Sequence, residues 1–364
     1  MTCNQYLTNI LLKWHLKDNI RKMPWKGEKD PYKIWLSEII LQQTRVAQGL
    51  SYYHSFLKSF PHIHDLAQAP EQIVYKHWEG LGYYSRCKNL IKTARYISEK
   101  LDGKFPDTYD ELLKLYGVGP YTAAAIASFA FELPHAVIDG NVFRVLSRFY
   151  GVQEPIDTNS GKKIFSKIAG KQLSKIHPAL YNQAIMDFGA EICKPKKPLC
   201  DKCPANSKCI AFNTHLVNVL PVKQKTIKQK NRWLYYIVIN YKKRIYIKKR
   251  LGKDIWQNLH EFVLIESVLP LEKDELLFHP KLIEALKSVK FTAADISKIY
   301  KQKLTHQQIF AQFLEVKITG ELKDKSYTLV DGYGMDKLAF PKIISTYLQD
   351  KNVSLNLLKV NGKS

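Results

Sequence analysis

Four of the six cysteines lie in one short segment and restrict the folding of this chain more than any other feature. Cys193, Cys200, Cys203 and Cys209 follow the spacing C-x6-C-x2-C-x5-C. In a reducing compartment, thiols crowded in this way indicate a metal site more than disulfides. The spacing matches neither the common zinc pattern nor the bacterial ferredoxin pattern. Zinc and an iron–sulfur cluster therefore both stay open, beside two disulfides or four idle thiols.

The net charge points to a polyanionic partner. The chain has 364 residues, with 56 Lys and Arg against 33 Asp and Glu, which gives +23. Nucleic acid is the usual partner of such an excess, although a lysine-rich surface without a function gives the same total. Residues 1–19 lack the pattern of a secretory signal, and no apolar run reaches the ~20 residues that cross a membrane. We expect a cytoplasmic protein that associates with nucleic acid, without a membrane contact.

The chain reads as three parts. Residues 1–212 have apolar side chains at three- and four-residue spacing, which predicts helices. Residues 213–232 predict a basic linker, because five cations and no acid occur near its end: Lys223, Lys225, Lys228, Lys230 and Arg232. Residues 233–364 open with two runs rich in aromatic and β-branched residues, which predict a β-hairpin and an α+β domain. Each domain is long enough to bury its own core.

The segment "DTYDELLKLYGVGPYTAAAIASFAF" predicts two helices joined by a tight turn. Asp107 or Thr108 can cap the first helix. Gly117, Val118 and Gly119 form the turn, because glycine takes positive φ freely, and the proline that follows suits the start of a helix. Free N–H groups of the second helix can bind a phosphate without reading a base. The plainer interpretation is an ordinary turn between helices.

Two carboxylates occur in contrasting contexts. Glu38 shares a helical stripe with Ile34 and Leu41, so burial would raise its pKa and keep it protonated as a general acid. Asp139 and Asn141 stand where a helix begins, and N–H groups there favour an ionised carboxylate. Glycosidic cleavage needs such a pair, because one group donates a proton and the other stabilises positive charge on the sugar. The plainer interpretations are a solvent-facing glutamate and a helix cap.

Six segments together resemble the MutY-type adenine DNA glycosylases, which belong to the endonuclease III-like helix–hairpin–helix superfamily. They are "PYKIWLSEIILQQTRV", "WEGLGYYSR", "LYGVGPYTAAAIASFA", "IDGNVFRVLSR", "NQAIMDFGAEIC" and the cysteine array, in the order of the family. The resemblance implies a mainly α helix–hairpin–helix glycosylase domain with a [4Fe–4S] loop, followed by an α+β Nudix-like C-terminal domain.

The resemblance also assigns roles to residues. Its pattern implies that Cys193, Cys200, Cys203 and Cys209 hold a [4Fe–4S] cluster. Glu38 matches the general acid that protonates adenine. Asp139 matches the group that stabilises the oxocarbenium-like sugar, with Asn141 beside it, and Tyr121 matches a residue close to that sugar.

The position of Tyr121 distinguishes two chemistries. Bifunctional relatives, which cut the strand after removing a base, carry a lysine there that forms a Schiff base with the sugar. Phe143 stands where some adenine glycosylases have a lysine that traps abasic DNA. We therefore expect a monofunctional hydrolase with little lyase activity.

Base flipping costs a few kcal/mol and calls for residues that fill the gap in the duplex. Gln43 matches an intercalating glutamine of the family, and Leu81 and Tyr83 match residues that insert beside the opposite base. For "GLGYY" the plainer interpretation is a glycine-broken turn with packed aromatic rings, and both can hold.

The last part of the chain resembles the Nudix-like domain more weakly. Thr305 and His306 offer a hydroxyl and an imidazole that suit the O8 and N7–H edge of 8-oxoguanine. Val263, Leu304 and Thr305 depart from the family pattern, and the hydrolytic Nudix signature is absent. We expect a monomer that removes adenine opposite 8-oxoguanine or guanine in double-stranded DNA, without pyrophosphate hydrolysis. The alternatives are a glycosylase–lyase for damaged pyrimidines and a non-catalytic DNA-binding protein with a metal.

Overall fold

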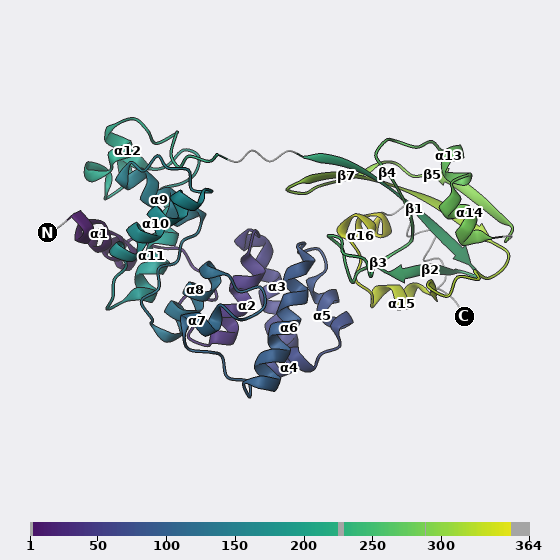
Figure 1. Cartoon of the computed structure of the whole chain (residues 1–364), viewed down its shortest axis with the longest axis horizontal. Helices are drawn as coiled ribbons and strands as arrows, with labels where there is room; N and C mark the ends of the chain where they lie inside the picture. The colour runs from purple at the N-terminus through teal and green to yellow at the C-terminus, as the bar shows by residue number, and fades with distance from the viewer. Residues whose placement is uncertain (1–2, 225–228, 288, 351–364) are drawn as a thin grey trace. The chain divides into compact units, whose positions relative to one another are not determined.

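The computed structural model describes residues 3–224, 229–287 and 289–350 (Figure 1). The chain forms two compact units. The first comprises residues 1–67 and 92–226, and the second comprises residues 68–91 and 227–364. Two cations of the predicted linker, Lys225 and Lys228, lie outside the described residues. Among the described residues, no helix has both the length and the apolar character that a membrane crossing demands.

The first unit is helical. Its core joins the first helix to three later ones through buried residues such as Leu11, Val142 and Phe188. Trp14 packs edge-on against Phe188 with ring centroids 5.1 Å apart. The elements are α1 (Cys3–Lys17), α2 (Pro31–Leu41), α3 (Val46–Ser59), α4 (Ile63–Gln68), α7 (Tyr109–Leu112), α8 (Pro120–Phe131), α9 (Gly140–Tyr150), α10 (Asn159–Gln172), α11 (Pro178–Glu191), η1 (Cys200–Lys202), η2 (Asn206–Lys208) and α12 (Ile210–Asn213).

The helix–hairpin–helix forms as expected from its local sequence. Thr108 caps α7 by accepting a hydrogen bond from the N–H of Glu111. Gly117 has φ +75°, a conformation that side chains disfavour, and Pro120 opens α8. A Cβ added at Gly119 would have no neighbour within 4 Å, so the approach to the start of α8 is open.

A mixed sheet dominates the second unit. Central strand β1 pairs in parallel with β7, from Lys230 opposite Gln307 to Asn240 opposite Lys317. The strands are β1 (Lys230–Tyr241), β2 (Arg244–Lys249), β3 (His260–Glu261), β4 (Val263–Ser267), β5 (Phe291–Ile296), β6 (Tyr300–Lys303), β7 (Gln307–Ile318) and β8 (Thr328–Val330); the helices are α13 (Lys273–Leu277), α14 (Pro280–Leu286), α15 (Gly332–Asp336) and α16 (Lys342–Gln349). The expected hairpin is present, with Lys242 and Lys243 at positive φ between β1 and β2.

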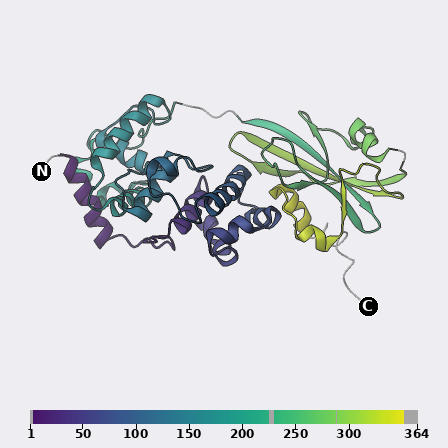
Figure 2. The ribbon, with the colours of Figure 1, turned by 60° about the horizontal axis from the view of Figure 1, so that its bottom comes forward.

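Side chains of β1 alternate between two covered faces. Tyr235 and Ile237 belong to a core with Leu282 of α14. Tyr236 faces the other way and stacks on Phe313, which itself stacks on Tyr347 of α16 with ring centroids 3.8 Å apart. In Figure 2 the yellow helical segment near the C-terminus lies beside this sheet. The period of two therefore buries both faces of the strand.

Residues 68–91 pack within the second unit although they lie early in the chain. They form α5 (Glu71–Trp78) and the start of α6 (Tyr84–Lys100), which continues into the first unit. The Asn258 amide donates to Tyr75 Oη at 2.9 Å, and Glu79 Oε1 accepts from Phe340 N at 3.1 Å and Ser345 Oγ at 2.7 Å.

Candidate active site

A cavity of about 490 Å³ lies among α2, α8, α9 and α11 in the first unit. All four residues predicted to act in the chemistry line it: Glu38, Tyr121, Asp139 and Asn141. They come from three helices and are separated by about a hundred residues of sequence, so the fold brings them together. Both carboxylates can therefore act on one group bound in this cavity.

Glu38 is buried inside the apolar face of α2. Asp30 caps this helix and Pro31 starts it, which places the glutamate two turns further on. Its exposed fraction is 7%. Loss of water around the carboxyl raises its pKa to about 7, opposed by a hydrogen bond with Tyr121 and aided by the charge of Asp139. A solvent-facing glutamate is thus excluded, and this side chain holds a proton near neutral pH.

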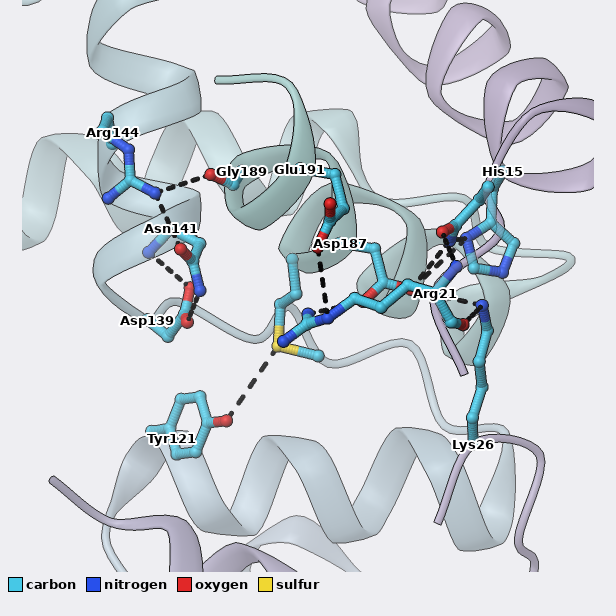
Figure 3. A network of polar contacts seen from close by, with 12 residues as sticks. His15, Arg21, Lys26, Tyr121, Asp139, Asn141, Arg144, Asp187, Gly189 and Glu191 are labelled. Carbon is cyan, nitrogen blue, oxygen red and sulfur yellow. Dashed lines mark hydrogen bonds and ion pairs between the residues drawn. The ribbon is translucent and has the colours of Figure 1, made fainter. Parts of the chain in front are cut away.

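Asp139 is fixed at the start of α9 by three short hydrogen bonds, and Figure 3 shows it beside Asn141. Its Oδ1 accepts from the backbone N–H groups of Asn141 and Val142, each at 2.8 Å, and its Oδ2 accepts from the Asn141 amide at 2.7 Å. Desolvation nevertheless raises the pKa of Asp139 above its ordinary value. The hydrogen bonds lower this pKa, but by less than desolvation raises it. Helix capping and a chemical role are therefore compatible, because the cap fixes the carboxylate at the cavity wall.

Tyr121 stands in the first turn of α8. Its hydroxyl lies 4.0 Å from the Met186 sulfur (Figure 3). Burial, together with the negative charges of Glu38 and Asp139, raises its pKa well above the ordinary value. The phenol therefore stays neutral and can donate a hydrogen bond to the Glu38 carboxylate.

Arg144 connects Asn141 at the cavity with the cysteine segment. The sequence did not predict this connection. Its Nη2 donates to Asn141 Oδ1 and to the Gly189 carbonyl, both at 2.7 Å, and its Nε donates to the Cys193 carbonyl at 2.7 Å. A Cβ on Gly189 would come within 2.6 Å of the Asn141 side chain, so α9 and α11 approach closely at this point. The guanidinium thus fixes the orientation of the asparagine that holds Asp139.

A polar wall opposite the carboxylates was also missed. Asp187 of α11 has no exposed surface, and it accepts from Arg21 Nη1 at 2.9 Å and Asn19 Nδ2 at 2.8 Å. Lys26 Nζ lies 3.3 Å from the same carboxylate and His15 Nδ1 lies 3.9 Å from it (Figure 3). His15, Arg21 and Lys26 line the cavity. The signal available in the sequence was an aspartate on the otherwise apolar stripe of "NQAIMDFG".

The four clustered cysteines are all free thiols and follow directly after α11. Cys193, Cys203 and Cys209 pack against the core of the first unit, and Arg148 Nη1 lies 3.5 Å from Cys193 Sγ. Burial first, and then the neighbouring sulfurs, raise the pKa of Cys203 to about 12. Four thiolates together thus need a compensating cation. No three His, Cys, Asp or Glu of the described residues are close enough to hold one metal ion. Four cysteine sulfurs are a donor set that both zinc and iron–sulfur clusters accept.

The predicted wedge residues differ in exposure. Gln43 is exposed and has φ +54°, and Tyr83 is 43% exposed with φ +48°. Non-glycine residues in this conformation store strain, which is found preferentially at functional sites. Leu81 is only 5% exposed, so its side chain lies in the interior, as a packed turn requires. Val118 of the hairpin is also buried, which leaves Gly117 and Gly119 at the turn surface.

Thr305 and His306 are exposed in the turn between β6 and β7. The Thr305 hydroxyl lies 2.6 Å from Tyr83 Oη, and both residues belong to the second unit. The structure therefore brings together one predicted wedge residue and one residue predicted to read the lesion, although 222 positions separate them in sequence.

Comparisons with known proteins agree with this geometry. Residues 36–170 match the model of the HhH-GPD superfamily of base excision DNA repair proteins. The adenine DNA glycosylase of Buchnera aphidicola subsp. Baizongia pistaciae (strain Bp) is 38% identical over 259 residues, which cover 69% of this chain and 72% of that protein. A thermostable thymine-DNA glycosylase structure is 28% identical, with a TM-score of 0.54, over 58% of this chain and 97% of the other. An endonuclease III structure with DNA, 22% identical, shares the fold at a TM-score of 0.51 over 59% of this chain and 99% of that one.

The helical unit, its hairpin and the cavity with two carboxylates define a DNA glycosylase of the helix–hairpin–helix superfamily. Within this superfamily, the 38% identity to an adenine DNA glycosylase extends over more than two thirds of both chains and identifies the family. The chain belongs to the adenine DNA glycosylase family.

Proposed function

We propose that this protein hydrolyses the N-glycosidic bond of adenine mispaired with 8-oxoguanine or guanine in double-stranded DNA, as a monomer and without cutting the strand. Membership of the family supports an adenine glycosylase of base excision repair. One observation carries the mechanism: Glu38, with a pKa of about 7, lines the same cavity as Asp139.

The reaction begins when adenine leaves the base stack and enters the cavity. Adenine is a poor leaving group until a ring nitrogen takes a proton, and protonated Glu38 is the available donor. Cleavage leaves positive charge at the sugar, which Asp139 stabilises through its fixed carboxylate. Water then adds to the sugar carbon and Glu38 is the base that accepts its proton.

The wall of His15, Arg21 and Lys26 is suited to contact the flipped base, because these three side chains line the cavity. Asp187 lies buried behind them and holds Arg21 and Lys26 by ion pairs. This wall therefore positions the base, while the opposite wall supplies the chemistry.

The side chains at two positions, Tyr121 and Phe143, support a monofunctional reaction. Tyr121 and Phe143 occupy the positions at which related enzymes carry lysine, and a Schiff base needs that amine. An end-labelled duplex with A opposite 8-oxoguanine tests this proposal. Strand cleavage at adenine that needs alkali is the expected result. Cleavage without alkali would indicate a lyase, and no cleavage a binding protein.

We propose that Cys193, Cys200, Cys203 and Cys209 hold a [4Fe–4S] cluster. When bound, the cluster would cross-link the loop after α11 and supply no atom to the hydrolysis. Protein purified without oxygen is expected to contain iron and sulfide near four each per chain, as thiolate-ligated clusters do. Stoichiometric zinc without sulfide would contradict this assignment.

We further propose that the turn with Thr305 and His306 recognises 8-oxoguanine beside Tyr83. The hydrogen bond between Tyr83 and Thr305 supports it, because it ties a ring that can stack on a base to a hydroxyl that can bond to its edge. Replacement of both turn residues by alanine is expected to lower the ratio of single-turnover excision rates for A:8-oxoguanine over A:G, with the A:G rate retained. A ratio equal to that of the wild type would remove this role.

A further inference from the structure

A second cavity, of about 930 Å³, lies in the sheet unit. It is lined by the end of β2, the loop 250–254, β3 and β8. Its carboxylates are already paired. Arg232 binds Glu266 and Asp254, and Arg250 binds Asp254 and Glu261. These ion pairs fix the loop that forms one side of the cavity.

Positive charge remains after this pairing. Lys249, Lys253 and Lys281 line the cavity and are exposed, and within the described ranges none has a carboxylate within 4.0 Å. Two buried nitrogens at the cavity also lack a hydrogen-bond partner: Arg250 Nε, on a side chain only 10% exposed, and His260 Nδ1. Unsatisfied buried polar groups are rare in native proteins, and they call for an explanation.

We propose that this cavity binds a nucleotide unit, with its phosphate against Lys249, Lys253 and Lys281 and its sugar inside. Its volume lies in the range of ligand sites and exceeds what a phosphate alone would fill. Two sources supply this chemistry: a nucleotide within DNA and a free nucleotide.

The sheet register favours DNA as the source. Because β1 and β7 run in parallel, their first residues lie at the same end of the sheet. Arg232, at the start of β1, reaches from the cavity to Gln307 Oε1 at 3.5 Å, directly after the turn of Thr305 and His306. The turn of Thr305 and His306 therefore lies at the same end of the sheet as Arg232, which lines the cavity. The DNA part of this proposal rests on the proposed function, whereas the nucleotide part does not.

The test compares two triple variants of the full-length protein. Lys249→Gln, Lys253→Gln and Lys281→Gln together remove the cations of the cavity. Lys242→Gln, Lys290→Gln and Lys317→Gln remove the same charge elsewhere in the unit, two of them where β7 ends.

Affinity for an A:8-oxoguanine duplex is measured by anisotropy between 50 and 200 mM salt, with Glu38→Gln in every protein to prevent turnover. The slope of log K against log salt is negative. We expect its magnitude to be smaller in the cavity variant than in the control variant by about 0.9, which corresponds to the loss of one phosphate contact. Equal slopes in both variants exclude DNA as the source.

The second measurement is calorimetric titration of inorganic pyrophosphate into the wild type and the cavity variant. If pyrophosphate binds to the wild type but not to the cavity variant, and the salt slopes for DNA are equal in the two triple variants, the cavity is a site for free nucleotides. No pyrophosphate binding together with equal slopes overturns the proposal. Excision at saturating enzyme, measured in proteins that keep Glu38, is expected to be unchanged by the three cavity substitutions. A wild type that removes no adenine refutes the proposed function and leaves the pyrophosphate result valid.

Discussion

Glu38 combines a catalytic task with a cost in stability. The carboxyl is protonated below its pKa of about 7, so the single-turnover rate is expected to fall as the pH rises through this value. Glu38→Gln keeps the shape of the side chain but has no proton to donate. We expect it to bind A:8-oxoguanine DNA and to lose excision by ~10²–10⁴-fold, with a residual rate that no longer falls across pH 7. A near-normal rate would show that another group is the acid.

The same burial predicts a dependence of stability on pH. The pKa of Glu38 is raised from 4.5 to about 7 on folding, so its stabilising contribution is complete below 4.5 and disappears as the pH rises through 7. Glu38→Gln is therefore expected to be more stable than the wild type at pH 8.5, by about 3 kcal/mol at most, and equal to it at pH 4.5. Denaturant unfolding at both pH values measures the difference. An equal difference at both would mean that the carboxyl is not desolvated.

Arg86 is expected to position Tyr83. Its guanidinium lies 5.1 Å from the Trp78 ring centroid and 5.5 Å from that of Tyr83, and its Nη2 donates to the Gly82 carbonyl at 3.2 Å. Arg86→Lys keeps a charge but loses the planar group between the rings, a loss of roughly 1–2 kcal/mol. We expect a rate of excision opposite 8-oxoguanine about tenfold lower. Lys100→Gln, on the exposed end of the same helix, serves as the control and should leave the rate unchanged.

The place of Glu38 on an apolar stripe and the helix cap at Asp139 could be predicted from local signals, whereas the chemical roles proposed for both came from the family resemblance. Asp187 and Arg21 were not predictable, since 166 positions separate them and neither stretch alone shows the pairing. Arg144 escaped for the same reason, because its acceptors at Gly189 and Cys193 come from another helix and its loop.

At the scale of elements, the start of α8 makes a prediction that separates folding from DNA binding. Gly119 has φ −97° and ψ −179°, which any residue adopts, and an added Cβ meets nothing. Gly119→Val should therefore fold, with a loss of ~1 kcal/mol or less at this cap position. The new side chain fills the space through which a phosphate would approach the free N–H groups. We expect affinity to fall severalfold for undamaged and mismatched duplexes alike, since phosphate contacts carry no sequence information.

The control for this prediction is Gly170→Ala. Gly170 lies exposed in α10, where a Cβ also meets nothing, and alanine stabilises a helix by up to ~1 kcal/mol relative to glycine. Its affinity for DNA should equal that of the wild type. If Gly119→Val bound DNA equally well, the hairpin would not contact phosphate.

Elements with local signals were predictable to within a few residues. Glycine and proline marked the helix–hairpin–helix, and a short basic turn marked the β1–β2 hairpin. The parallel pairing of β1 with β7 was not predictable, because Lys230 pairs with Gln307 across most of the second unit and no turn connects them. The linker predicted from the sequence includes residues 230–232, which are the first residues of β1. Their positive charge continues that of the linker, and the acids that pair with Arg232 lie more than 20 positions further along the chain.

At the scale of the whole molecule, residues 68–91 are the segment whose stability depends on a distant part of the chain. Tyr75 and Glu79 make hydrogen bonds to Asn258, Phe340 and Ser345. Deletion of residues 227–364 leaves these groups without those partners. We expect amide hydrogen exchange in α5 to become faster in the shortened chain, with protection of α9 and α11 unchanged. Equal protection of α5 in both proteins would show that the segment is held by the first unit.

The membership of residues 68–91 in the sheet unit bears on how such enzymes can be recombined. A hybrid protein joined just before β1 would combine α5 of this chain with the sheet of a relative. The Glu79 carboxylate would then face the relative's residues in place of Phe340 and Ser345. Exchange that carries both stretches together respects the contacts. An exchange of the sheet unit that preserves these contacts therefore has to carry residues 68–91 together with residues 227–364.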